Sequence, residues 1–254
     1  MKKYALICML CLVLAGCGAR AGSRGASSAM HPKEVDLRLN LVESHITGRQ
    51  YQLALQELLK VEGAADHLSR YHFDSGLIYL GLDELEKARD GFTKAVEIDD
   101  DFAEAWNNLG KIEEALGRDS QAEAAYRKSF SILTYVTPEF AAYNLGTLLL
   151  RQGRLKEAED FGRKALARNW RFIPAYKLLS DVFVAQNRMD DAEAVLKSGL
   201  EADMNSTSTM LALAEHQVRI GKSSEAKDLF ERIAKQYPKS SEAKVARDYL
   251  DLLQ

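Results

Sequence analysis

Small residues recur along the chain at nearly constant intervals. Six alanines lie 34, 34, 36, 34 and 34 residues apart, at Ala54, Ala88, Ala122, Ala158, Ala192 and Ala226. A second series of mostly small residues precedes them, at Val42, Gly76, Gly110, Gly146, Ser180 and Ala214. Where two helices cross closely, any side chain larger than a methyl group pushes the axes apart. The pattern therefore predicts six pairs of tightly crossing helices.

The copy that begins at Ala103 has the clearest pattern. Trp106, Leu109 and Gly110 form the sequence W-x₂-L-G, and Ala122 with Tyr126 forms A-x₃-Y. These motifs and the 34-residue period resemble the tetratricopeptide repeat (TPR), a pair of antiparallel helices that stacks on its copies. The resemblance implies an all-α TPR solenoid, a right-handed superhelix of six helix-pair repeats.

The predicted TPR domain spans residues 34–254, with repeats at about 35–68, 69–102, 103–136, 139–172, 173–206 and 207–240. Residues 241–254 show helical spacing of apolar positions and are predicted to form a C-terminal capping helix. Left-handed turn residues are predicted between paired helices at Gly48, Gly81, Gly117, Gly153, Asn187 and Gly221.

The N-terminus resembles that of a bacterial lipoprotein. Residues 1–16 begin with Lys2 and Lys3 and continue as an apolar run that predicts a secretory signal peptide. The run ends in Leu14-Ala15-Gly16-Cys17, which is similar to a lipobox, where cleavage precedes the cysteine that carries the acyl chains. Residues 17–33 are predicted to be a lipidated N-terminus and flexible tether. The alternative is an ordinary signal peptide with a chance cysteine.

Location and charge restrict the partners. The residue after Cys17 is Gly18. By resemblance to lipoproteins of two-membrane bacteria, the absence of aspartate at this position favours the outer membrane, with the protein facing the periplasm. Removal of the predicted signal peptide takes away Lys2 and Lys3 and leaves 32 basic against 37 acidic residues. This acidic balance argues against nucleic acid as the main partner. A mature chain with Cys17 as its one cysteine forms no internal disulfide.

The chain shows no pattern of catalytic or cofactor-binding residues. Its five histidines are scattered and form no metal-ligand spacing: His31, His45, His67, His72 and His216. His67 and His72, which flank a repeat boundary, are expected at the surface. Glycine-rich sequence is confined to the predicted tether, so no phosphate-binding loop is expected. We therefore expect a binding protein without enzyme activity, cofactor, metal or small-molecule substrate.

The resemblance to TPR proteins also implies a binding groove. In that family, positions five, nine and twelve of each first helix face the concave side. Apolar or aromatic residues occupy most of positions five and twelve, at Leu39, Ile46, Phe73, Leu80, Tyr143, Leu150, Val184, Leu211 and Val218. These residues predict an apolar groove for an amphipathic segment of a partner. The alternative is that neighbouring helices cover several of them.

An aromatic group lies at the junction after the fourth repeat. It consists of Trp170, Phe172 and Tyr176. These side chains either form an outward-facing contact site or fill the interface where the family pattern has a proline.

Six repeats behind a lipobox resemble the type IV pilus pilotins, the PilF, PilW and Tgl-like TPR lipoproteins. The stretches 141–146 (AAYNLG) and 154–159 (RLKEAE) add to the likeness. The resemblance implies a non-enzymatic protein that binds outer-membrane secretin subunits and promotes their targeting and multimer assembly. The alternative is a lipid-anchored TPR adaptor of envelope assembly, similar to BamD or to NlpI, a scaffold for peptidoglycan enzymes.

Overall fold

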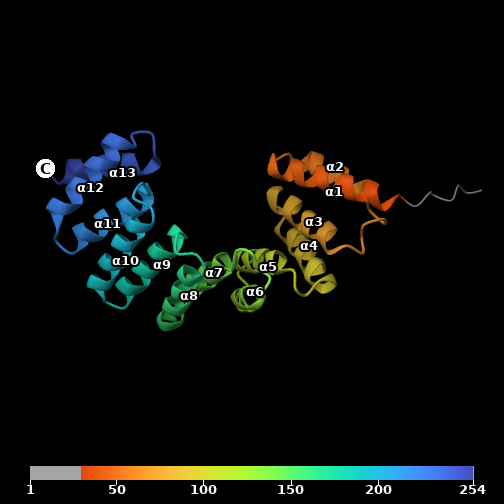
Figure 1. Cartoon of the computed structure of the whole chain (residues 1–254), viewed down its shortest axis with the longest axis horizontal. Helices are drawn as coiled ribbons and strands as arrows, with labels where there is room; N and C mark the ends of the chain where they lie inside the picture. Colours follow the sequence, from red (N-terminus) through yellow and green to blue (C-terminus); the bar gives the residue numbers. More distant parts are fainter. Residues whose placement is uncertain (1–29, 254) are drawn as a thin grey trace, which may run out of the picture.

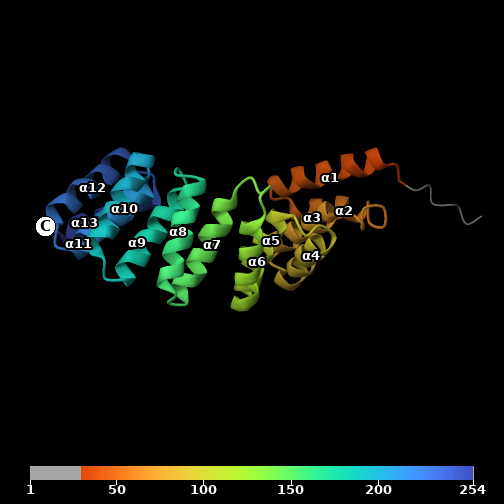
Figure 2. The same cartoon turned by 60° about the horizontal axis from the view of Figure 1, so that its bottom comes forward.

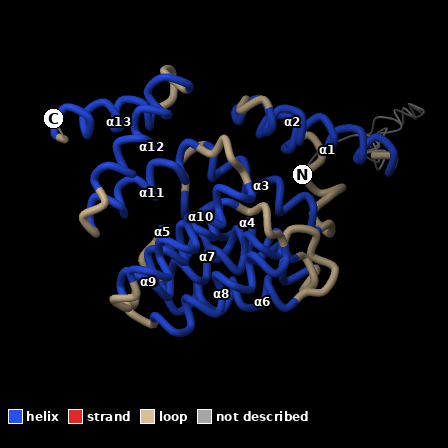
Figure 3. The backbone as a smooth tube through the Cα atoms, turned by 60° about the vertical axis from the view of Figure 1, so that its left-hand side comes forward, coloured by secondary structure: helices blue, strands red, loops and turns tan. Residues whose placement is uncertain are grey.

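The computed structural model describes residues 30–253, which contain thirteen α-helices and no strand (Figure 3). The helices are α1 (Pro32–Thr47), α2 (Tyr51–Leu59), α3 (Ser69–Gly81), α4 (Leu85–Ile98), α5 (Ala103–Ala115), α6 (Asp119–Ser131), α7 (Pro138–Arg151), α8 (Leu155–Arg168), α9 (Ile173–Ala185), α10 (Met189–Ala202), α11 (Thr207–Arg219), α12 (Ser223–Gln236) and α13 (Ser241–Leu252). The predicted all-α solenoid is confirmed.

Successive helix pairs stack into an open arc (Figure 1). Helices α5, α7 and α9 lie on the inner side of the arc, and α6, α8 and α10 lie on the outer side. The turn from α7 to α8 lies on the lower edge in Figure 2, whereas the loop from α6 to α7 lies on the upper edge. Each pair is therefore a hairpin that runs between the two edges of the arc.

The N-terminal boundary differs from the prediction. Helix α1 begins at Pro32, which supplies a fixed φ at the first turn, and His31 caps it by accepting a hydrogen bond from the amide of Lys33. The predicted tether, which ended at residue 33, is therefore too long by the first residues of this helix. The predicted signal peptide and Cys17 lie outside the described residues.

The small residues lie at the closest helix crossings. A methyl group on Gly91 of α4 would lie 2.7 Å from the backbone nitrogen of Gly76 on α3. A methyl group on Gly110 would lie 2.6 Å from the ring of Tyr126. All six repeating alanines have no exposed surface. The predicted reason for the small-residue series, close crossing of paired helices, is confirmed at these positions.

Two of the six predicted turn residues, both glycines, are wrong. Gly117, Gly153, Asn187 and Gly221 have positive φ, as predicted. In the first two turns, however, the left-handed residues are Arg49 (φ 55°) and Asp83 (φ 62°). Because Gly81 still lies in α3 and Gly48 has φ −76°, the left-handed residue follows each of these glycines.

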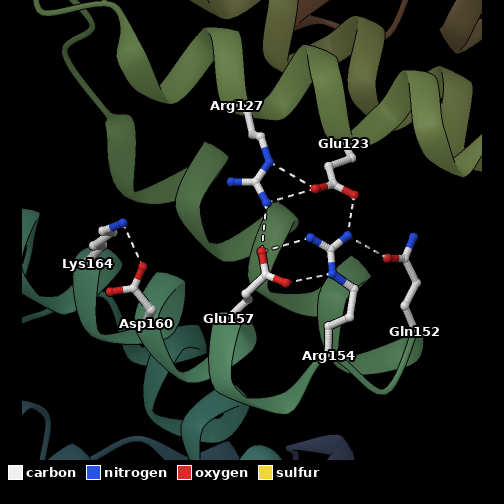
Figure 4. A network of polar contacts seen from close by, with 7 residues as sticks. All are labelled: Glu123, Arg127, Gln152, Arg154, Glu157, Asp160 and Lys164. Atoms are coloured by element: carbon white, nitrogen blue, oxygen red, sulfur yellow. Dashed lines mark hydrogen bonds and ion pairs between the residues drawn. The ribbon is translucent and has the colours of Figure 1, made fainter.

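From α4 onward, charged side chains join each second helix to the next one. A basic residue directly before a second helix pairs with a glutamate of the preceding second helix, at Arg118–Glu86, Arg154–Glu123, Arg188–Glu159 and Lys222–Glu193. We call these four pairs the ion-pair ladder. Figure 4 shows one of them, in which Arg154 also binds Glu157, and Arg127 bridges Glu123 and Glu157.

Candidate functional site

The inner side of the arc carries an open recess of about 430 Å³ between α5 and α7. Its lining is a mixture of charged, polar and aromatic residues: Lys111, Glu114, Ala115, Tyr126, Tyr143, Asn144, Thr147 and Arg151. A smaller recess of about 200 Å³ continues from Tyr143 to Pro174 and Lys177 of α9 and to Ser208 and Thr209 of α11. Tyr143 thus joins two recesses into one surface, which we call the inner groove.

Polar contacts between repeats fix the floor of the inner groove. The amide of Asn144 donates to the side-chain oxygen of Asn107 over 3.0 Å. Arg151 donates to Glu114 over 2.6 Å, and the hydroxyl of Tyr126 donates to the same carboxylate over 2.9 Å. Burial, followed by the nearby charge of Glu114, raises the pKa of Tyr126 above its ordinary value. The phenol therefore stays protonated and continues to donate.

Leu39 does not belong to an accessible groove. This residue has no exposed surface and lies in the core of the first repeat with Val35 and Val42. The prediction is wrong at this position because α3 packs against α1 and covers the side chain.

The other eight predicted groove residues are half-buried: Ile46, Phe73, Leu80, Tyr143, Leu150, Val184, Leu211 and Val218. Each packs against a core cluster. The ring of Phe73, for example, lies 4.7 Å from that of Phe102 and 5.7 Å from that of Phe92, measured between centroids. Neighbouring helices therefore take up much of this apolar surface, and its role in binding stays a prediction.

The residues predicted for the groove omit its polar half. Lys111 and Thr147 lie at position nine of their repeats, which the family pattern places on the concave side. Asn144 and Arg151 lie at positions six and thirteen, each one residue beyond a predicted position. Asn144 and Arg151 depend on pairing with Asn107 and Glu114 of the preceding repeat, which only the superhelix brings about.

The aromatic group and His216 lie where successive helices pack. Phe172 and Tyr176 are buried at the α8–α9 junction, whereas Trp170 is 59% exposed, so the aromatic group both fills the interface and faces outward. His216 is buried, 3% exposed, with its Nε2 atom 3.0 Å from the carbonyl oxygen of Met189. Packing of α11 against α10 buries the His216 ring.

Within residues 30–253, no group of three or more His, Cys, Asp or Glu side chains is arranged to hold a metal ion. None of the helices in this part of the chain is long and apolar enough to cross a membrane. The inner groove has instead the size, shape and mixed polarity of a surface that can bind a polypeptide segment.

Comparison with known proteins supports the repeat assignment. Family models described as tetratricopeptide repeats match residues 69–102, 101–169, 149–208 and 183–247. The chain is a tetratricopeptide repeat protein. Proteins of this family typically act as scaffolds that bind protein partners.

Solved TPR structures are similar over most of the chain. The crystal structure of PilW, a widely conserved type IV pilus biogenesis factor, covers 85% of this chain and 99% of its own, with a TM-score of 0.73 and 22% identity. PilF of Pseudomonas aeruginosa covers 85% of this chain and 98% of its own, with a TM-score of 0.70 and 16% identity. YrrB, a TPR protein with an unusual peptide-binding site, covers 75% and 97%, with a TM-score of 0.54 and 17% identity.

Two curated sequences match part of the chain. The protein O-mannosyl-transferase TMTC3 of Mus musculus is 28% identical over 142 residues, which are 51% of this chain and 15% of that protein. Its Homo sapiens counterpart is 26% identical over 168 residues, which are 61% of this chain and 18% of that protein. This TPR chain thus spans less than a fifth of those proteins, and the likeness carries no transferase function to it.

Proposed function

We propose that this protein is a type IV pilus pilotin, a lipoprotein that binds outer-membrane secretin subunits and promotes their targeting and multimer assembly. The observation that carries the proposal is the structural likeness to PilW and PilF, which extends over 85% of this chain and nearly the whole of theirs. The lipobox-like sequence that ends at Cys17 adds a predicted anchor in the outer membrane.

The inner groove is the proposed binding surface for a secretin segment. Its Tyr143 offers aromatic contact, while Asn144, Lys111 and Lys177 offer polar contacts along the same path. A segment bound there would be shielded until neighbouring secretin subunits replace the contact. The acyl chains on Cys17 would confine this capture to the membrane and raise the local concentration of secretin. In this proposal, no bond is made or broken.

Deletion of the gene tests the function. We expect heat- and detergent-resistant secretin multimers to disappear from outer membranes of the deletion strain and to return when the wild-type gene is restored. Undiminished multimers in the deletion strain would reject the pilotin assignment. Defects in other outer-membrane or peptidoglycan proteins would instead favour an envelope adaptor of the BamD or NlpI type. Mass spectrometry of the mature N-terminus tests acylation of Cys17.

Charge reversal tests the inner groove. Lys111 and Thr147 are exposed residues of the recess, so the double change Lys111→Glu and Thr147→Glu should leave the fold intact. We expect capture of secretin subunits by this variant to fall about tenfold or more, since loss of a residue that dominates an interface costs about 2 kcal/mol or more. The matched control, Lys156→Glu, changes an exposed lysine on α8, on the outer side of the arc, and should bind normally. Equal capture by all three proteins would remove the groove from the proposal.

A further inference from the structure

The loop between α6 and α7 presents apolar side chains to solvent. Leu133 is 93% exposed and Val136 is 84% exposed. Residues 132–137 (ILTYVT) contain no charged side chain, although 28% of the chain is charged. Ile132 and Tyr135 are 8% exposed and pack into a cluster with Ala103 and Ala141. These inward side chains fix the loop, so that Leu133 and Val136 are held outward.

Exposed apolar residues recur in the next loops of the same kind. Val136, Trp170 and Met204 are each 34 residues apart, and Trp170 and Met204 are 59% and 69% exposed. Every loop between helix pairs lies on one edge of a hairpin solenoid. The loops that carry these three residues therefore follow one another along the same edge of the arc, which is the upper edge in Figure 2.

Phe140 connects the first two loops of the row. This residue is 45% exposed, and its ring lies 4.8 Å from that of Phe172, two residues beyond Trp170. The first loop is thereby connected to the second. We call the row the loop edge; it consists of Leu133, Val136, Phe140, Trp170 and Met204.

Basic groups accompany the loop edge. Arg168 and Arg171 flank Trp170, and the guanidinium of Arg171 lies 5.3 Å from the centre of the Trp170 ring. Arg232 donates a hydrogen bond of 2.9 Å to the carbonyl oxygen of Met204. The loops 132–137, 169–172 and 203–206 contain a single carboxylate, that of Asp203.

The preceding loop of the same edge has the opposite character. Between α4 and α5 it carries the exposed residues Asp99, Asp100 and Asp101. The apolar and basic character is thus restricted to the part of the edge from α6 onward.

We propose that the loop edge rests on the surface of a bilayer that contains anionic phospholipids. Tryptophan, aliphatic side chains and arginines together are typical of proteins that lie in the headgroup region of a membrane.

Shallow insertion of five side chains gives only weak membrane binding by itself. The contact therefore requires that the TPR domain is held near the membrane. The proposal therefore rests on the predicted anchor at Cys17 but not on the identity of the secretin partner. The thirteen residues from Gly18 to Met30, as a flexible tether, would span roughly 20 Å, which keeps the local lipid concentration high. The loop edge would then set the orientation of the arc, with α7 to α11 against the bilayer.

Fluorescence of Trp170 tests the contact. The predicted mature chain, residues 17–254, contains Cys17 as its only cysteine, so a maleimide lipid couples it to vesicles of phosphatidylethanolamine and phosphatidylglycerol. The change Trp106→Phe leaves Trp170 as the single tryptophan. On coupling, we expect a blue-shifted emission, quenching by brominated lipid and an approximately threefold lower quenching constant for iodide.

Three variants complete the design. Leu133→Ser with Val136→Ser, in the Trp106→Phe chain, should reduce the protection of Trp170 from iodide. The matched control Leu252→Ser changes a leucine that is 80% exposed on α13 and should leave that protection unchanged. The reciprocal variant Trp170→Phe retains Trp106, whose indole donates to the carbonyl oxygen of Asp100, and should show no quenching by brominated lipid.

Unchanged access of iodide to Trp170 after coupling would overturn the proposal. So would protection without vesicles, which would assign the loop edge to a second copy of the chain, or protection only after secretin subunits are added, which would assign it to a protein partner. The coupling is chemical and contains no secretin. Failure of the pilotin assignment would therefore leave this result unaffected, and the two failures are distinguishable.

Discussion

Gly91 on α4 occupies a position where the backbones of two helices touch. A methyl group there would meet the nitrogen and Cα atoms of Gly76, 2.7 and 2.9 Å away, and the carbonyl oxygen of His72 at 2.9 Å. Backbone atoms cannot rotate away as a flexible side chain can. Close approach of α3 and α4 therefore depends on the absence of a side chain at this residue.

We expect Gly91→Ala to lower the free energy of unfolding by about 1–3 kcal/mol, because overpacking outweighs the gain in helix propensity. Gly48→Ala is the matched control, since its methyl group would meet nothing closer than 3.4 Å at an ordinary φ. Urea unfolding followed by circular dichroism measures both. Equal stability of Gly91→Ala and the wild type would show that α3 and α4 can separate without cost.

Asp74 on α3 is a buried carboxylate, 1% exposed, whose Oδ2 atom has no hydrogen-bond partner among the described residues. Burial, and secondarily the charge of Glu43, raises its pKa from 3.8 to about 7, while Arg70 acts in the opposite direction. Because the pKa is higher in the folded state, this group favours folding fully below about pH 4, and its contribution is lost as the pH rises through 7.

Asp74→Asn removes the charge at nearly constant shape. We expect the variant to be more stable than the wild type by about 1–2 kcal/mol at pH 8. The difference should disappear or reverse at pH 4, where the wild-type carboxyl is protonated. Urea unfolding of both proteins at the two pH values measures the change. A difference that does not depend on pH would contradict the raised pKa.

At the scale of helices, the ion-pair ladder couples repeats that the apolar core already joins. In three of its four pairs the glutamate is the less exposed partner: the side chains of Glu123 and Glu159 are 19% exposed and that of Glu193 is 7% exposed. Glu193 binds Lys197 over 2.8 Å and Lys222 over 2.6 Å. Hydrogen bonds from these lysines lower its pKa from 4.5 to about 2.

A carboxylate with a lowered pKa stabilises the fold above its ordinary pKa. For Glu193 the stabilisation should be complete near neutral pH and be lost as the pH falls from about 4.5 to about 2. Glu193→Gln should therefore cost about 1–2 kcal/mol at pH 7 and nothing near pH 2. The control Glu231→Gln breaks the single exposed pair with Lys235 and should have no measurable effect at either pH. Thermal unfolding against pH distinguishes these outcomes.

At the scale of the whole molecule, the two ends of the solenoid differ. The C-terminal end is covered by α13, which buries Ala243 and Ala246 against α12. The first repeat has a nine-residue second helix, and it exposes Leu37 and Leu53 by 69% and 46%. The ladder also lacks a pair between α2 and α4, because Glu84 stands where later repeats have arginine or lysine and binds Lys87 instead.

Stability in a solenoid is a sum of repeat and interface contributions, so the end with the weaker interface opens first. We expect amide hydrogens of α1 and α2 to exchange with deuterium faster than those of α11 and α12, and those of α7 and α8 to exchange slowest. Hydrogen exchange followed by mass spectrometry measures the order. Equal protection along the chain would indicate that the six pairs unfold as one unit.

The sequence determined the class of fold because the requirement for small residues is local. A pair of helices that crosses at Ala122 and Gly110 needs those residues whatever lies beyond it, and the 34-residue period repeats the requirement. Turn residues were predictable where glycine or asparagine is left-handed. They were not predictable at Arg49 and Asp83, where the packing of the flanking helices imposes a positive φ on ordinary residues.

The tertiary structure decided which side chains are available to a partner. Position within a repeat places Leu39 and Tyr143 on the same face, but stacking of the pairs buries the first and leaves the second in the inner groove. Two further features exist only because repeats stack along the arc: the contact of Asn144 with Asn107, and the row from Leu133 to Met204. Helix pairing depends on short-range spacing, whereas exposure depends on neighbours that are a whole repeat away in the sequence.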